Sequence, residues 1–265
     1  MNPVLSKIRI YPIKSLDPMD LEKVEIGNTC LIGDRNYGIL GKDGRFVNGK
    51  RTGRVNQLVS VYDDNLEWVQ FSERGENHPK KSFHLKKDIE AIETYLADFF
   101  EIPVHFLFND QGRFMDIPDE SSITVVAHET IHSLANEFEE DCNTMSLRFR
   151  SNLEIGNVPA FWEEYLARPD RVNGVKFKIG DVELIGMSLR ARCNVPPRNP
   201  LTGETDKTFI KRMVNYREKT IPNWTRVLDY GSLYHLTINT YIPDNQNGKI
   251  LKIGDPVEIM DLIPL

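Results

Sequence analysis

The segment from Val182 to Asp206 reads V-E-L-I-G-M-S-L-R-A-R-C-N-V-P-P-R-N-P-L-T-G-E-T-D and carries a single cysteine, Cys193. Its first part alternates apolar and polar residues, as a half-buried strand does. It then reaches residues that cannot continue a strand ladder: Pro196, Pro197, Pro200 and Gly203. The segment therefore predicts a strand that ends in a loop, with Cys193 at the junction.

Three arginines flank this cysteine: Arg190, Arg192 and Arg198. Nearby cations favour the thiolate over the thiol, and the thiolate is the form that binds soft metals or attacks electrophiles. The alternative is that Cys193 is a small buried hydrophobic residue, which is the more frequent role of a free cysteine. Both interpretations stay open on this segment alone.

Composition limits the classes of function. A chain of 265 residues with 40% hydrophobic and 27% charged residues can bury the cores of two modest domains. Its net charge of -6 argues against nucleic-acid binding, which needs a concentrated basic face. The local basic run of Lys50, Arg51 and Arg54 is therefore expected to be a solvated loop.

The cysteines and the N-terminal segment indicate the compartment. Cys30, Cys142 and Cys193 are odd in number and widely spaced, so they indicate neither a disulfide framework nor a cysteine-rich zinc site. A reducing environment fits this pattern. Residues 1–12 contain no long apolar run, so we expect neither a signal peptide nor a membrane anchor, and a cytoplasmic protein without membrane partners.

The first half is expected to consist of short strands. Residues 4–11 alternate until Pro12, and further strands are predicted at 21–26 and 58–62, with a hairpin signal at Asp43-Gly44. Residues 88–100 form the clearest helix, because apolar residues recur at helical spacing and Pro103 ends the pattern. This spacing of strands favours a β-barrel or meander.

A polar, turn-rich stretch at residues 109–122 suggests a boundary between two domains, at 1–118 and 119–265. The second half is expected to contain a strand at 123–126, a helix through Ile131, Leu134 and Phe138, an edge-like strand at 148–155 and a helix near 209–216. The tetrapeptide K-I-G-D occurs at 178–181 and again at 252–255, which predicts one hairpin device used twice. The predicted fold class is α+β: mainly β with some helices, as two β-barrel-like domains.

The segment His128-Glu129-Thr130-Ile131-His132 matches H-E-x-x-H, which on a helix presents two imidazoles for zinc with the glutamate as base. The preceding residues are β-branched, however, so His128 is expected at a helix start. A third ligand would have to be Glu154, Glu163 or Glu164. A zinc hydrolase is therefore a second alternative function.

Three separated motifs and Cys193 together resemble a known family. The motifs are Y-P-I-K-S at residues 11–15, D-R-N-Y at 34–37 and R-F-R-S-N at 148–152. With F-K-I-G-D-V-E-L before R-C and T-G after it, the chain resembles the MOSC (molybdenum cofactor sulfurase C-terminal) domain with its N-terminal β-barrel domain. Within that family it is most similar to the mitochondrial amidoxime reducing component and its bacterial homologues. It departs from them at Tyr37 for Trp, at Ser151 for Pro, and in the loop after Cys193, where Pro196, Pro197 and Asn199 stand in place of two threonines and an aspartate.

The resemblance implies a molybdenum cofactor, molybdopterin with molybdenum, in a cleft between the domains. It implies Cys193 as the molybdenum ligand and catalytic residue, with the phosphate and ring edges of the pterin held by Lys14, Ser15, Arg35, Arg150 and Asn152. A phosphate suits a lysine charge and an arginine fork, and a heterocycle edge suits Asn or Ser. The implied activity is reduction of N-hydroxylated or other N-oxygenated small molecules. Since the chain carries no flavin, haem or iron–sulfur motif, an external redox protein would supply the electrons. The alternative is a sulfur carrier or cofactor-binding module, because MOSC domains also occur fused to pyridoxal-phosphate desulfurases.

Overall fold

The computed structural model describes residues 2–75, 78–109, 114, 122–170 and 172–265. The strands are β1 (Val4–Ile10), β2 (Met19–Leu21), β3 (Lys23–Glu25), β4 (Tyr37–Gly41), β5 (Leu58–Tyr62), β6 (Trp68–Glu73), β7 (Lys81–His84), β8 (Val104–Phe108), β9 (Thr124–Ala127), β10 (Leu153–Gly156), β11 (Asn173–Ile179), β12 (Val182–Ala191), β13 (His235–Tyr241), β14 (Ile250–Lys252) and β15 (Val257–Pro264). The α-helices are α1 (Ile89–Phe100), α2 (His128–Phe138), α3 (Cys142–Phe149) and α4 (Phe209–Thr220), and short 3-10 turns are η1 (Gly53–Asn56), η2 (Trp162–Leu166), η3 (Val227–Tyr230) and η4 (Asp244–Gln246).

The largest sheet has eight strands in the order β15-β11-β12-β13-β9-β10-β1-β2. All its pairs are antiparallel except β9 with β10. The turn before β15 also returns to β1, because the Leu5 amide donates to the Asp255 carbonyl (2.9 Å) and the Gly254 amide to the Leu5 carbonyl (2.8 Å). The sheet is therefore barrel-like. The predicted α+β class, mainly strand with some helices, is confirmed.

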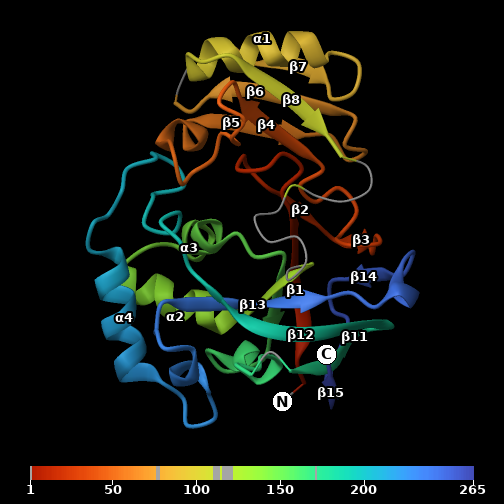
Figure 1. Cartoon of the computed structure of the whole chain (residues 1–265), viewed down its shortest axis with the longest axis vertical. Coiled ribbons are helices and arrows are strands. Elements are labelled where there is room, and N and C mark those ends of the chain that lie inside the picture. Colours follow the sequence, from red (N-terminus) through yellow and green to blue (C-terminus); the bar gives the residue numbers. More distant parts are fainter. Residues whose placement is uncertain (1, 76–77, 110–113, 115–121, 171) are drawn as a thin grey trace.

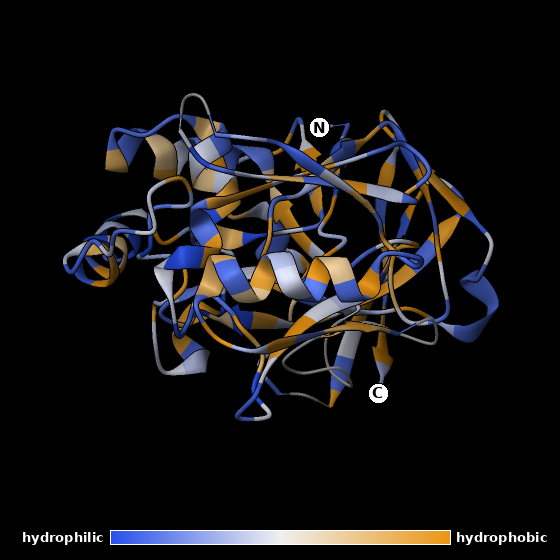
Figure 2. Cartoon of the chain, turned by 90° about the horizontal axis from the view of Figure 1, so that it is seen from above, coloured by the Kyte–Doolittle hydropathy of each residue, from blue (hydrophilic) through white to orange (hydrophobic). Residues whose placement is uncertain are grey.

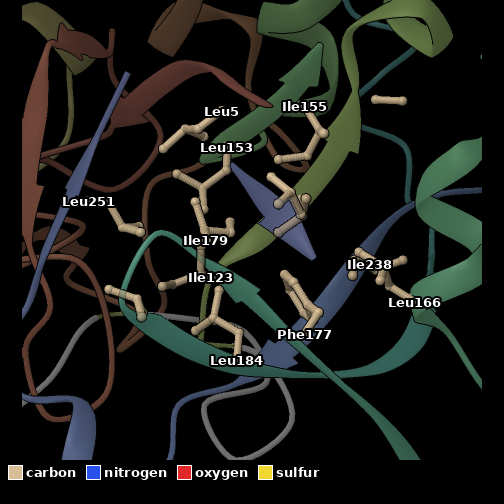
Figure 3. Packing of buried hydrophobic residues seen from close by; sticks show 14 of the residues in the cluster. Leu5, Ile123, Leu153, Ile155, Leu166, Phe177, Ile179, Leu184, Ile238 and Leu251 are labelled. Atoms are coloured by element: carbon tan, nitrogen blue, oxygen red, sulfur yellow. The ribbon is translucent and has the colours of Figure 1, made fainter. Parts of the chain in front are cut away.

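Hydrophobic residues of this sheet point inward into one core. Leu5, Leu153, Ile155, Phe177 and Leu184 are completely buried in it, as Figure 3 shows. Burying a side chain of this size contributes roughly 1.5–3 kcal/mol. The core residues do not keep strict alternation along these strands. Leu5 and Ile8 of β1, and Leu184 and Leu189 of β12, all lie in the core because the pairing register shifts between them.

A second core lies in the other half of the molecule. It gathers apolar residues of β4 to β8 and of α1, whose Ile92 and Leu96 are completely buried. Figure 1 shows this unit at one end of the long axis and the eight-stranded sheet, with α2, α3 and α4, at the other. The helix predicted over 88–100 and the strand predicted at 58–62 are confirmed.

The two packing units do not follow the two halves of the sequence. β1 lies between β10 and β2 in the large sheet, and β3 pairs with β14 from the end of the chain. The core of the C-terminal unit therefore contains six residues of the first half: Leu5, Ile8, Ile10, Val24, Ile26 and Leu31. The position proposed for the boundary between domains 1–118 and 119–265 falls within 115–121, outside the described residues.

The predicted strand over 148–155 is wrong in its first part. Asp141 caps α3, because its carboxylate accepts from the Thr144 amide (2.9 Å), and the helix runs through Arg148 to Phe149. Arg150 then ends the helix with φ of 54°. The strand β10 starts only at Leu153, and it is an inner strand between β9 and β1 rather than an edge.

The two K-I-G-D turns have different roles. The first joins β11 and β12, which pair with each other as predicted, and Gly180 adopts φ of +56° in the turn. The second joins β14 and β15, which pair with β3 and β11 respectively. The prediction of a second hairpin is therefore wrong.

Hydrophobic and hydrophilic residues are interleaved along the strands and helices, as the view from above in Figure 2 shows. Within the described part of the chain, none of the helices combines the length and the apolar character needed to cross a bilayer.

Candidate functional site

A cavity of about 700 Å³ lies where the two units meet. The first half contributes residues 14, 15, 17, 18, 35, 48–50, 55 and 56. The C-terminal half contributes the end of α3, the end of β12 with its following loop, and residues of β13. The site is therefore assembled from segments that are far apart in the sequence.

The cavity wall is strongly basic although the chain carries a net charge of -6. Among the described residues, one carboxylate lines it, Asp17, and both oxygens of that carboxylate accept from Arg74 (2.9 and 3.0 Å). Eight cationic side chains line it: Lys14, Arg35, Lys50, Arg148, Arg150, Arg190, Arg192 and Arg198. Such a concentration of positive charge favours an anionic ligand.

Five of the six residues proposed for the cofactor line this cavity: Lys14, Ser15, Arg35, Arg150 and Cys193. They come from four segments: the loop after β1, the turn before β4, the residue that follows α3, and the loop after β12. The tertiary structure brings these segments together.

Asn152 does not line the cavity. Its side chain is buried, donates to the Arg9 carbonyl (3.0 Å) and accepts from the Thr124 amide (3.2 Å). Its Oδ1 lies 3.5 Å from Nη1 of Arg35. Asn152 therefore supports the wall behind Arg35.

Three lining residues adopt left-handed backbone conformations: Ser15 with φ of 74°, Arg35 with 58° and Arg150 with 54°. This region costs a residue with a side chain on the order of 1–2 kcal/mol. Such cost is found where surrounding contacts fix the backbone, and it often marks functional sites. Here these three backbone conformations direct polar or cationic side chains into one cavity.

Tyr11 organises two of these cations. The guanidinium of Arg150 lies 3.9 Å from the centre of the Tyr11 ring, and that of Arg35 lies 4.7 Å from it. Arg35 also pairs with the buried Asp34, whose other oxygen accepts from the Tyr11 amide (2.9 Å). Burial lowers the pKa of Arg150, and the neighbouring charge of Arg35 adds to that effect. An anion between the two guanidiniums would offset both the burial of the Arg150 charge and its repulsion from Arg35.

Cys193 lies just past the end of β12 and is exposed, as the sequence predicted for a strand-to-loop junction. Its carbonyl accepts from the Tyr234 hydroxyl (3.1 Å). Cys30 is buried and Cys142 is half-buried, and all three cysteines are free. The thiol that lines the basic cavity is therefore that of Cys193.

Two arginines hold the loop after Cys193. Arg148 donates to the carbonyls of Pro196 (2.8 Å) and Arg198 (2.9 Å). Arg198 donates to the carbonyl of Gly49 in the first half (2.7 Å). The loop that contains the departures from the family pattern is thus fixed to both units.

The backbones of Gly53 and Gly203 approach each other closely at the same contact. A Cβ atom placed on Gly53 would lie 2.6 Å from the carbonyl oxygen of Gly203, so neither position accepts a larger residue without displacement.

The sequence did not indicate Arg148 as a site residue, because residues 148–155 are predicted as a strand. The end of a helix places this side chain under the loop instead.

The basic run 50–54 is largely solvated, as predicted. Arg51 pairs with Asp43 and Arg54 with Glu101 at the surface. Lys50 is exposed but also lines the cavity, so it contributes to the positive wall.

The H-E-x-x-H segment does not form a metal centre in the described part of the chain, where no group of three or more His, Cys, Asp and Glu side chains could hold a metal ion. His128 is the first residue of α2, as expected, and its Nδ1 lies 2.9 Å from Glu154. That hydrogen bond raises the pKa of His128. His132 lies 3.7 Å from the exposed Glu129. Glu163 faces Thr130 instead.

This arrangement defines a class: an α+β protein with a strongly basic cavity between its two units and an exposed cysteine in the cavity lining. Residues 2–103 match the family of the MOSC N-terminal beta barrel domain, and residues 108–258 match the MOSC domain. The chain belongs to the MOSC domain family.

One curated relative is a "Molybdenum cofactor sulfurase" from Caenorhabditis briggsae, 20% identical over 235 residues. The match covers 82% of this chain and 32% of that protein, so the chain spans about a third of the relative's length. Two solved structures are also similar. The YUAD protein from Bacillus subtilis has a TM-score of 0.39 and 12% identity, over 98% of this chain and 96% of that one. A hypothetical protein has a TM-score of 0.46 and 9% identity, over 98% of this chain and 69% of that one.

Proposed function

We propose that the cavity binds a molybdenum cofactor and that the protein reduces N-oxygenated small molecules. The observation that carries this proposal is a cavity with eight cationic side chains and an exposed thiol in a protein of net charge -6. A pterin phosphate needs cations and hydrogen-bond donors, and molybdenum needs a soft ligand such as a thiolate. The residues present therefore fit the cofactor.

Each side chain has a role in this proposal. Lys14, Ser15, Arg35 and Arg150 would hold the phosphate and the ring edges, and Asn152 would keep Arg35 in position. Cys193 would ligate the molybdenum. When bound, the cofactor supplies two-electron chemistry that the protein side chains cannot perform.

The overall reaction needs two electrons from an external reductant. An N-hydroxylated substrate takes up two electrons and two protons, its N–O bond breaks, and an N–H compound and water are released. The electrons would come from a separate redox protein, because the sequence contains no flavin, haem or iron–sulfur motif.

A second candidate function is sulfur transfer. The similarity to a molybdenum cofactor sulfurase and the exposed Cys193 support a module that binds the cofactor and carries sulfur as a persulfide on this cysteine. Both candidates use the same cavity, and they differ in whether Cys193 ligates molybdenum during N–O reduction.

The experiment compares the wild type, Cys193→Ser and the matched control Cys142→Ser after expression in cells that make the cofactor. Molybdenum and pterin per chain, reduction of benzamidoxime with a chemical electron donor, and persulfide labelling are measured for each. The reductase proposal expects cofactor in the wild type and in Cys142→Ser, with amidoxime reduction lost only in Cys193→Ser. Bound pterin with a labelled Cys193 persulfide and no reduction would establish the sulfur carrier instead. A wild type without molybdenum or pterin would contradict both.

A further inference from the structure

Arg190 lies near the end of β12, and Arg192 follows the strand directly, just before Cys193. Both side chains line the cavity. They come from a different element than Lys14, Ser15, Arg35 and Arg150. The cavity therefore has a second group of cations, beside the thiol.

Polar contacts orient the Arg190 guanidinium. Its Nη1 donates to Oδ1 of Asn239 (3.1 Å), and Nδ2 of Asn239 points to the Ser188 hydroxyl (3.4 Å). Asn239 and Ser188 are buried and also line the cavity. This side chain is thus held at the wall rather than extended into solvent.

Arg192 is held by neutral groups. Its Nη2 donates to the Phe149 carbonyl (2.9 Å), and its guanidinium stacks on the Phe149 ring at 5.3 Å. Its Nε is buried and has no hydrogen-bond partner among the described residues. Arg192 therefore keeps an uncompensated charge at the cavity.

The local electrostatics favour an anion here. Arg190 and Arg192 line the same wall, and the Nε of Arg192 is buried without a partner among the described residues. Asp17 is the single described carboxylate in the lining, and it is already paired with Arg74. A bound oxyanion would offset the desolvation of Arg192 and the repulsion between the two guanidiniums.

We infer that Arg190 and Arg192 form a second anion subsite, which recognises a carboxylate on the N-oxygenated substrate. This inference rests on the proposed function, since it assigns the phosphate of the cofactor to the clamp of Lys14, Ser15, Arg35 and Arg150. The planar fork of a guanidinium matches the two oxygens of a carboxylate. Because the pair lies beside Cys193, a small substrate could reach both with its carboxylate one aromatic ring away from its N–O group.

The test compares two substrates that differ by one charge, benzamidoxime and 4-carboxybenzamidoxime, with the cofactor-loaded protein. The ratio of their kcat/KM values is measured for the wild type, Arg190→Gln, Arg192→Gln and the surface control Lys178→Gln. We expect the wild type and the control to prefer the carboxylate. Each arginine variant should lower this preference roughly ten- to a hundredfold, the value of one lost charge-assisted hydrogen bond. Equal losses on both substrates, or a wild type without a preference, would overturn the inference.

A binding experiment separates this inference from the proposed function. Calorimetric titration of both compounds, and of inorganic phosphate, needs no turnover. Tighter binding of 4-carboxybenzamidoxime that depends on Arg190 but not on Lys178 supports the subsite even where neither compound is reduced, and in that case only the reductase proposal fails. Phosphate that competes with 4-carboxybenzamidoxime at this site and binds more tightly would show that the pair serves a phosphate and would contradict the carboxylate assignment. Arg190→Gln keeps the test decisive if Arg192→Gln does not fold.

Discussion

At the scale of single residues, the site depends on the contacts that hold the positively charged side chains of Arg35 and Arg150 close together. Arg35 and Arg150 both stack on the Tyr11 ring, and Arg35 is balanced by Asp34. The Tyr11 hydroxyl is buried and has no partner among the described residues, so the ring, rather than the hydroxyl, makes the useful contact. A cation above an aromatic ring gains about 0.5–2 kcal/mol.

The role of Tyr11 predicts different effects of two substitutions. Tyr11→Phe keeps the ring and removes only the unpartnered hydroxyl, so phosphate affinity should stay within about twofold of the wild type. Tyr11→Leu removes the surface on which both guanidiniums stack, and phosphate affinity should fall about tenfold, which corresponds to about 1.4 kcal/mol. Calorimetric titration with inorganic phosphate measures both. Equal losses in the two variants would show that the hydroxyl matters, and equal retention would show that the ring does not position the arginines.

At the scale of elements, α3 connects the site to the fold. Its N-cap Asp141 fixes where the helix begins, its penultimate residue Arg148 holds the loop after Cys193, and its C-cap Arg150 points into the cavity. One short helix thus sets the positions of two cations. This arrangement requires a left-handed backbone conformation at Arg150, a position where glycine is the usual residue.

The energetic cost of this backbone conformation can be measured by comparing Arg150→Gly with Arg150→Ala. Both variants lose the guanidinium, so phosphate affinity should fall about equally, by roughly one to two powers of ten. They differ in the backbone, because glycine adopts positive φ without strain. We expect the glycine variant to be more stable than the alanine variant by about 1 kcal/mol in urea unfolding. An alanine variant of equal or greater stability would argue against strain at this position.

At the scale of the whole molecule, the C-terminal unit is completed by the N-terminus. Leu5 and Ile8 of β1 are completely buried in the core of the large sheet, and the start of β15 pairs with residues 3–5. The other unit, with β4 to β8 and α1, is inserted between β3 and β9 along the chain. The cavity therefore requires both units and this crossing of the chain between them.

The shared core predicts the behaviour of a fragment that contains residues 120–265. Without β1 the sheet lacks an inner strand, so the fragment should show no cooperative thermal transition and should bind neither phosphate nor cofactor. Circular dichroism and calorimetric titration test this. Addition of separately produced residues 1–108 should restore the transition, because the missing strand is then supplied. A fragment that unfolds cooperatively near the temperature of the full chain would show that β1 is dispensable, and cofactor binding by that fragment would contradict the shared cavity.

Much of the local structure could be predicted from short stretches of the sequence. Alternation at residues 182–191 predicted the strand that leads to Cys193, and helical spacing with Pro103 predicted α1. These features depend on periodicity and on the exclusion of proline from ladders and helices, which are encoded within about ten residues. The motifs containing Lys14, Arg35 and Arg150 also indicated, through the family resemblance, residues that the structure places in one cavity.

Features that depend on distant partners were decided only by the tertiary structure. The same K-I-G-D tetrapeptide forms a hairpin at 178–181 and a crossover at 252–255, because the strand after the second turn pairs with β11. Asn152 lies behind the wall rather than on it, since Arg9 and Thr124 engage its side chain. Asn152 and Arg9 lie 143 positions apart, and the two K-I-G-D turns have identical local sequences, so local periodicity contains no information about either difference. Short-range patterns therefore predicted several of the elements and the chemistry of the candidate residues, whereas long-range strand pairing decided which of these residues share a cavity.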